Sequence, residues 1–147
     1  MRPKIARVDL ADMMTYGSRA GMEVMVLAKY GVGTSNAVIK IELTRDNAAE
    51  FCELYLGDTS SRCVEKVIKE DGSRLRPEVT GNCTAKTWTD MYGNSYVFKG
   101  KNSSPQGHLA AEYIVQDVKT GDVLDASSAS GYAVTLDVFK ALCPSSL

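Results

Sequence analysis

The sequence predicts an α+β fold: a small single domain with an antiparallel sheet built of β-hairpins, a helical hairpin and a short C-terminal helix. Three observations lead to this prediction. The chain has 147 residues, which is the length of one ordinary domain. Several neighbouring stretches alternate apolar and polar residues around short turns, a pattern typical of antiparallel hairpins. Other stretches have apolar residues at helical spacing between recognisable start and stop residues.

The composition indicates a folded domain and disfavours two classes of partner. We take residues 1–147 as one domain and residues 1–18 as an N-terminal segment whose structure the pattern does not define. The chain is 44% apolar and 24% charged, which favours a globular protein over a disordered one. The net charge of −1 is spread over interspersed signs, so we expect no nucleic-acid partner and no membrane anchor. No apolar run approaches the ~18 residues of a transmembrane helix, so no membrane span is expected.

The first predicted hairpin covers residues 22–43. Positions 22, 24, 26 and 28 and positions 37, 39, 41 and 43 are apolar at strand spacing. The loop between them, Tyr30–Asn36, has two glycines and several hydroxyls that could form an anion nest. It lacks the lysine of a phosphate-binding loop, and no third glycine opens a helix after it. We therefore interpret it as a hairpin loop that needs positive φ.

A helical hairpin is predicted after this sheet hairpin. Thr44 is the predicted N-cap of the first helix, and Gly57 is its stop. The second helix is predicted over residues 62–70, with hydroxyl residues before it and Asp71-Gly72 at its end. An antiparallel pair of helices results.

The C-terminal half is predicted to contain two more hairpins and a final helix. The second sheet hairpin turns near Gly93-Asn94, and the third turns at Lys119-Thr120-Gly121. Pro144 follows the end of the last helix. The predicted ranges are 73–82 for a connection, 83–100 and 111–125 for the two hairpins, 101–108 for a polar loop and 135–143 for the helix.

The four cysteines, Cys52, Cys63, Cys83 and Cys143, are predicted to form two disulfides. Their gaps of eleven, twenty and sixty residues lack the close pairs of structural zinc sites, so no metal site is expected. Cys52 lies five residues before Gly57 and Cys63 six after it, so they face each other across the helical hairpin. Cys83 and Cys143 then pair by elimination, which ties a central strand to the C-terminus. The alternative is four buried thiols, which is common in cytosolic proteins.

The cysteines also bear on the compartment. The first residues contain no continuous apolar stretch of the kind that a signal peptide has. The disulfide interpretation nevertheless favours an oxidising compartment, so we expect a periplasmic or secreted protein whose signal peptide has been removed. A cytoplasmic protein with reduced thiols is the alternative.

The sequence contains no evident catalytic constellation. His108 is the single histidine, so a serine or cysteine nucleophile has one candidate base, and no G-x-S-x-G surrounds a serine. Neighbouring carboxylates are interpreted as solvated surface, although burial of one of them would indicate an enzyme site. These pairs are Asp122 with Asp125, Glu50 with Glu53, and Glu70 with Asp71. No cofactor motif is present, so we expect no cofactor.

The segment Ser127–Val134 is the candidate binding loop, because it is small, rich in hydroxyls and held between a strand and a helix. Its string Ser128-Ala129-Ser130-Gly131 resembles the "SASG" loop of the periplasmic and membrane-bound C-type lysozyme inhibitors. This resemblance implies a loop that inserts into a lysozyme cleft. The resemblance covers only these four residues. The family's Trp-x-Lys-Gly segment is absent here, and its fold is an all-β barrel, unlike the α+β fold predicted for this chain. The structural alternative is a connection into the last helix.

We therefore expect a non-enzymatic, exported domain that binds a protein or another macromolecule through its loops. The contact loops would be Tyr30–Asn36, Lys101–His108 and Ser127–Tyr132. The alternatives are a small hydrolase-type enzyme that uses carboxylate, serine and tyrosine side chains, and a lysozyme-inhibitor-like protein. The binding residues named by this hypothesis are Ser127, Ser128, Ser130, Gly131, Tyr132 and His108.

Overall fold

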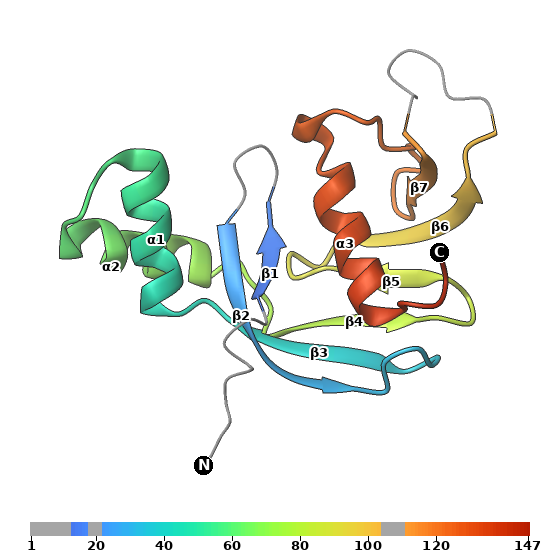
Figure 1. The fold of residues 1–147 in the computed structure, drawn as a ribbon, viewed down its shortest axis with the longest axis horizontal. Helices are drawn as coiled ribbons and strands as arrows, with labels where there is room; N and C mark the ends of the chain where they lie inside the picture. The colour runs from blue at the N-terminus through green and yellow to red at the C-terminus, as the bar shows by residue number, and fades with distance from the viewer. Residues whose placement is uncertain (1–12, 18–21, 104–110) are drawn as a thin grey trace.

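The computed structural model describes residues 13–17, 22–103 and 111–147, and it confirms the predicted α+β fold (Figure 1). In the described part of the chain, seven strands form one curled antiparallel sheet in the order β1-β2-β3-β4-β5-β6-β7. Every strand therefore pairs with its neighbours in sequence. The elements are β1 (Met13–Tyr16), β2 (Met22–Tyr30), β3 (Ala37–Glu42), α1 (Arg45–Leu56), α2 (Ser61–Gly72), β4 (Glu78–Asn82), β5 (Thr87–Thr89), β6 (Ser95–Lys101), β7 (Tyr113–Asp117), the 3-10 helix η3 (Ser128–Ser130) and α3 (Tyr132–Leu142).

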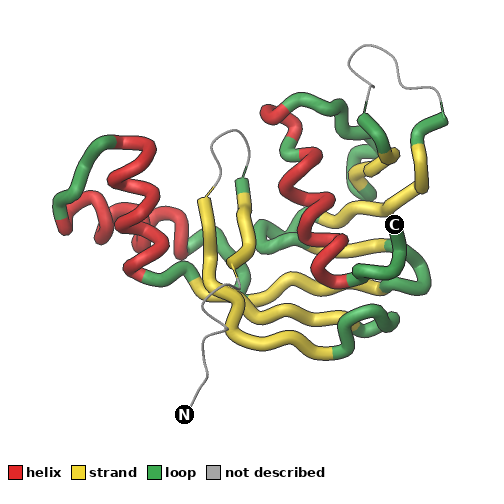
Figure 2. Tube along the Cα trace, viewed as in Figure 1, coloured by secondary structure: helices red, strands yellow, loops and turns green. Residues whose placement is uncertain are grey.

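The helices lie in two separate groups (Figure 2). α1 and α2 form the predicted hairpin beside the end of the sheet that contains β1 and β2, whereas α3 lies over the middle of the sheet (Figure 1). Thr44 caps α1 by accepting the backbone amide of Asn47, and Gly57 ends α1 in the left-handed conformation, both as predicted. Ser60 caps α2 by accepting the amide of Cys63.

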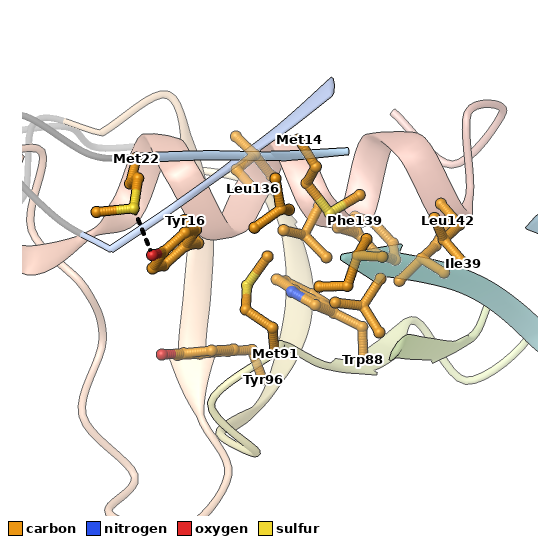
Figure 3. Packing of buried hydrophobic residues seen from close by; sticks show 14 of the residues in the cluster. Met14, Tyr16, Met22, Ile39, Trp88, Met91, Tyr96, Leu136, Phe139 and Leu142 are labelled. Carbon is orange, nitrogen blue, oxygen red and sulfur yellow. Dashed lines mark hydrogen bonds between the residues drawn. The ribbon is translucent and has the colours of Figure 1, made fainter. Parts of the chain in front are cut away.

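The core lies between α3 and the sheet. Trp88 on β5 stacks on Phe139 of α3 with ring centroids 4.5 Å apart, and Phe98 packs against the same ring at 5.2 Å. Figure 3 shows Trp88 and Phe139 at the centre of the cluster, with Ile39 and Leu142 beside them. All five side chains are buried. A rough transfer value of 1.5–3 kcal/mol for each large apolar side chain makes this cluster a main source of stability.

A glycine on β4 permits the close approach of α3. A Cβ added at Gly81 would stand 3.1 Å from the Cδ1 atom of Leu142, which is tighter than ordinary packing. A larger residue at this position would therefore push the C-terminal end of α3 away from the sheet.

Both predicted disulfides are present. Cys52 is bonded to Cys63 between α1 and α2, with Cα atoms 6.2 Å apart. Cys83 is bonded to Cys143, with Cα atoms 5.5 Å apart, and this bond joins the residue after β4 to the end of α3. The chain contains four cysteines, so all of its thiols are used in these two bonds.

Four parts of the fold differ from the prediction. Residues 13–16, placed in the undefined N-terminal segment, form β1 and pair with β2. Residues 78–82, interpreted as a connection, form β4, because they fill the space between β3 and β5. The third hairpin has one strand, β7, whose expected partner is reduced to a single bridge between Gln116 and Val123. The final helix begins at Tyr132, three residues earlier than predicted.

The two disulfides should contribute unequally to stability. Replacing Cys52 and Cys63 with alanine should lower the free energy of unfolding by about 3 kcal/mol, and replacing Cys83 and Cys143 by about 4 kcal/mol, because the longer loop loses more chain entropy. Urea unfolding followed by the fluorescence of Trp88, the single tryptophan, measures both values. A larger loss from the Cys52–Cys63 pair would contradict the chain-entropy explanation.

Candidate functional site

A pocket of about 300 Å³ opens where the end of β1, the turn between β5 and β6, and the start of α3 meet. We call it the SASG pocket because Ala129, Ser130 and Gly131 form one of its walls. Its lining is Gly17, Asp90, Met91, Tyr92, Asn94, Tyr96, Ala129, Ser130, Gly131, Val134, Thr135 and Val138. The structure thus brings part of the predicted binding loop into a cavity with residues from two distant parts of the chain, Gly17 and residues 90–96.

Asp90 organises the turn that forms the opposite wall. Its Oδ1 atom accepts the backbone amides of Tyr92 at 2.9 Å and of Asn94 at 3.0 Å. Its own amide donates to the carbonyl oxygen of Asn94 at 2.9 Å. Gly93 completes the turn with a φ of 85°, and the guanidinium of Arg76 would lie 2.6 Å from any Cβ there. Side-chain capping of this kind is the usual reason for aspartate and glycine in tight turns.

Asp90 is a buried ionisable residue, only 8% exposed. Burial raises its pKa above the ordinary value of 3.8, because water solvates the charged form better than the protein does. The turn amides and the Arg76 charge act in the opposite direction by lowering the pKa, and burial outweighs them. The pocket therefore has a fixed carboxyl that holds its proton more tightly than a carboxyl exposed to water does.

Two tyrosines supply the aromatic surface of the pocket. Tyr92 is 38% exposed, whereas Tyr96 is 9% exposed and packs against Trp88 with centroids 5.7 Å apart. Burial raises the pKa of Tyr92 and raises that of Tyr96 to about 12, so both phenols stay neutral at physiological pH. Neutral phenols can donate and accept hydrogen bonds.

Tyr16 supports Tyr92 from behind the pocket. The two rings meet edge to face with centroids 5.8 Å apart. The buried hydroxyl of Tyr16 donates to the Sδ atom of Met22 at 2.7 Å, the contact drawn as a dashed line in Figure 3, and it lies 3.2 Å from Oδ2 of Asp71 on α2. Burial and the Asp71 charge raise the pKa of Tyr16. These contacts fix β1, α2 and Tyr92 relative to one another.

The wall at η3 is closed by its own serines. The hydroxyl of Ser130 lies 2.8 Å from the carbonyl oxygen of Asp125 and 2.9 Å from that of Ser127, and it accepts the amide of Tyr132 at 3.1 Å. Ser127 bonds the carboxylate of Asp125. Gly131 then turns the chain into α3 with a φ of 75°. The hydroxyl of Ser130 is therefore used to build the turn.

The remaining members of the predicted site lie elsewhere. Ser127 and Ser128 are exposed outside the pocket, and Tyr132 accepts the backbone amide of Tyr113 at 3.0 Å, which attaches α3 to β7. His108 lies outside the described residues. Sequence reasoning missed Asp90, Tyr92 and Asn94. The run from Asp90 to Asn94 had the composition of an aspartate-capped turn, but nothing in it indicated that α3 would lie opposite.

In the described ranges, the other two contact loops and the carboxylate pairs contribute no residue to the SASG pocket. In the loop Tyr30–Asn36, Gly33 donates its amide to the carbonyl oxygen of Leu142 at 2.8 Å, so this loop packs on the end of α3. The part of the loop Lys101–His108 after residue 103 lies outside the described ranges. Asp71 contacts Tyr16, and Asp125 contacts Ser127. In the described ranges, no cluster of three or more His, Cys, Asp or Glu residues is arranged to hold a metal ion.

Comparison of the chain with protein-family models, with curated proteins and with solved structures finds no match. A search of the described helices for one long and apolar enough to cross a membrane also finds none.

The buried Asp90 carboxyl makes stability depend on pH in a defined direction. As the pH rises above 3.8, the unfolded chain loses this proton before the folded protein does, so the wild-type protein loses stability until the pH passes the raised pKa. Asp90→Asn keeps an oxygen for the turn amides and removes the titration. We expect the free energy of unfolding of this variant, relative to wild type, to increase as the pH rises above 3.8 and to level off once the folded wild-type protein has also lost this proton.

Urea titrations at each pH measure this difference. The matched control is Asp137→Asn on the exposed face of α3. A difference between Asp90→Asn and wild type that is constant across the pH range would show that burial does not control this carboxyl.

Proposed function

We propose that the protein is a non-enzymatic, extracytoplasmic binding protein that takes a sugar unit of a polysaccharide into the SASG pocket. The observation that supports this most directly is the combination of two tyrosines, a fixed carboxyl and an amide in one cavity of about 300 Å³. The two disulfides support an oxidising compartment, since such bonds persist outside the cytosol.

The chemistry of the lining suits a polyhydroxylated ring. The C–H faces of a sugar can lie on an aromatic ring such as that of Tyr92, while its hydroxyls pair with Asp90 and Asn94. Gly17 and Gly131 have no side chains, so backbone is open to a ligand at the rim. The volume lies at the lower end of the usual range for ligand pockets, which favours one ring over a longer stretch of polymer.

The electrostatics favour a neutral ligand over a cation. Arg76 lowers the pKa of Asp90 from its side of the turn, which shows that its positive charge acts on the same carboxyl. Burial favours the protonated form of this carboxyl, which weakens it further as a counter-ion. Asp90 is thus better suited to hydrogen bonding than to holding a lysine or arginine side chain.

The lining also favours binding over hydrolysis. Glycoside hydrolysis ordinarily uses two carboxyl groups on either side of the scissile bond. Among the lining residues that the structure describes, Asp90 carries the one carboxyl side chain. This supports a binding protein over the hydrolase-type alternative. The lysozyme-inhibitor alternative receives less support, because the Ser130 hydroxyl of the SASG string is bonded within its own turn.

Cosedimentation with insoluble cellulose, chitin and peptidoglycan tests this function. We expect the wild-type protein to bind at least one of the three, and Tyr92→Ala to bind it about tenfold more weakly, because one aromatic contact is lost. The matched control is Tyr30→Ala, since Tyr30 is 55% exposed and lies outside the pocket. The proposal would be refuted if the wild-type protein bound none of the three polymers, or if Tyr92→Ala bound as tightly as wild type. Release of reducing sugar would support the enzyme alternative.

A further inference from the structure

A second cavity of about 330 Å³ lies between α1 and the β1–β2 pair. We call it the α1 groove. Its lining is Thr15, Met22, Glu23, Asn47, Glu50, Phe51, Leu54 and Tyr55. It shares no residue with the SASG pocket, and Thr15 points away from the core that contains its neighbours Met14 and Tyr16. The α1 groove is therefore a separate surface.

The apolar part of the groove is unusually exposed. Leu54 is 68% exposed, Tyr55 is 53% exposed, and the next residue, Leu56, is 59% exposed. Below them the ring of Phe51 lies 5.3 Å from that of Tyr55. Phe51, Leu54 and Tyr55 line the groove, so it has an exposed apolar wall, which is typical of an interaction site.

The charged part of the groove has one sign. Glu23 on β2 and Glu50 on α1 both line the cavity, and no lysine or arginine is among the lining residues that the structure describes. Glu23 lies directly opposite Thr15 in the β1–β2 register, so it stands at the edge of the cavity formed by the sheet. A ligand that covers Leu54 would therefore lie close to two negative charges.

The groove is also held in one shape. The Cys52–Cys63 disulfide fixes α1 to α2 two residues before Leu54. At the other end, Asn47 bonds the capping residue Thr44, and its amide lies 3.6 Å from the Sδ atom of Met13 on β1. A preformed surface loses less entropy on binding than a mobile one does.

These charges decide between occupants. A second copy of the chain that packed symmetrically on this groove would bring four carboxylates together, which is unfavourable. An anionic membrane surface would be repelled by Glu23 and Glu50 for the same reason. A peptide segment with apolar and basic side chains satisfies both the leucine surface and the carboxylates.

We propose that the α1 groove docks a segment of a partner protein that combines apolar side chains with lysine or arginine. The apolar side chains cover Leu54 and Phe51, and the basic side chains pair with Glu23 and Glu50. This site is independent of the SASG pocket, so a protein partner and a polysaccharide can be bound at the same time.

The probe for this site is a fluorescein-labelled amphipathic helical peptide of fifteen residues made of leucine and lysine. The comparison peptide has glutamate in place of lysine. We expect the lysine peptide to raise the fluorescence anisotropy of the mixture with a Kd in the micromolar range, and the glutamate peptide to bind at least tenfold more weakly. Added salt should weaken the binding of the lysine peptide, because part of it is electrostatic.

Variants locate the binding. Leu54→Ser and the double variant Glu23→Gln, Glu50→Gln should each raise the Kd about tenfold or more. The matched controls are Leu27→Ser and Glu112→Gln, which should leave the Kd unchanged. Leu27 is 53% exposed, Glu112 is exposed, and neither residue lines the groove. Tyr92→Ala should leave the Kd unchanged. Absence of binding, equal binding of both peptides, or equal effects of the groove and control variants would each overturn the proposal.

Discussion

The attachment of α3 to β5 through Trp88 is the interaction on which the rest of the structure depends. Trp88 is 2% exposed, stacks on Phe139 and donates its indole N–H to Oγ1 of Thr135 at 3.0 Å. A rotation of α3 would leave that N–H buried without an acceptor, which costs about 1–3 kcal/mol. The helix therefore has one rotational setting. That setting places Thr135 in the SASG pocket and brings Cys143 against Cys83.

The two walls of the SASG pocket are turns that satisfy their own polar atoms. Asp90 accepts two amides of its turn, and Ser130 bonds within the turn that leads to Gly131. These local bonds hold the backbone of each turn in place. Tyr92 and Asn94 can therefore present a ring and an amide from a rigid support. Preorganisation of this kind favours the binding of small polar units, which otherwise gain little free energy from burial.

Most of the fold followed from local patterns, and the site did not. The helical hairpin was predictable because Thr44, Gly57 and the cysteine spacing are local signals of caps and of facing helices. β1 was missed because it has only four residues and its outward-facing Met13 is apolar although it is 41% exposed, so no alternation of apolar and polar residues marks the strand. The sequence predicted one wall of the SASG pocket and missed the other. Its serine wall is contiguous in sequence, but its other wall is brought there by the contact between Trp88 and α3.

The two cavities flank the same short strand yet differ in their charges. Gly17, which follows β1, borders the SASG pocket, while Thr15 within the strand borders the α1 groove. In the first cavity, Arg76 opposes the single carboxyl, and burial favours its neutral form. In the second, two carboxylates stand beside exposed leucine with no basic residue in the described lining. The proposed sugar ligand of the SASG pocket is neutral and supplies hydroxyls to Asp90 and Asn94. The proposed peptide ligand of the α1 groove supplies basic side chains to Glu23 and Glu50 and apolar side chains to Leu54. Thr15 and Tyr16 are neighbours on β1 and therefore face opposite sides of the sheet: Thr15 lines the α1 groove, whereas Tyr16 packs against Tyr92 of the SASG pocket.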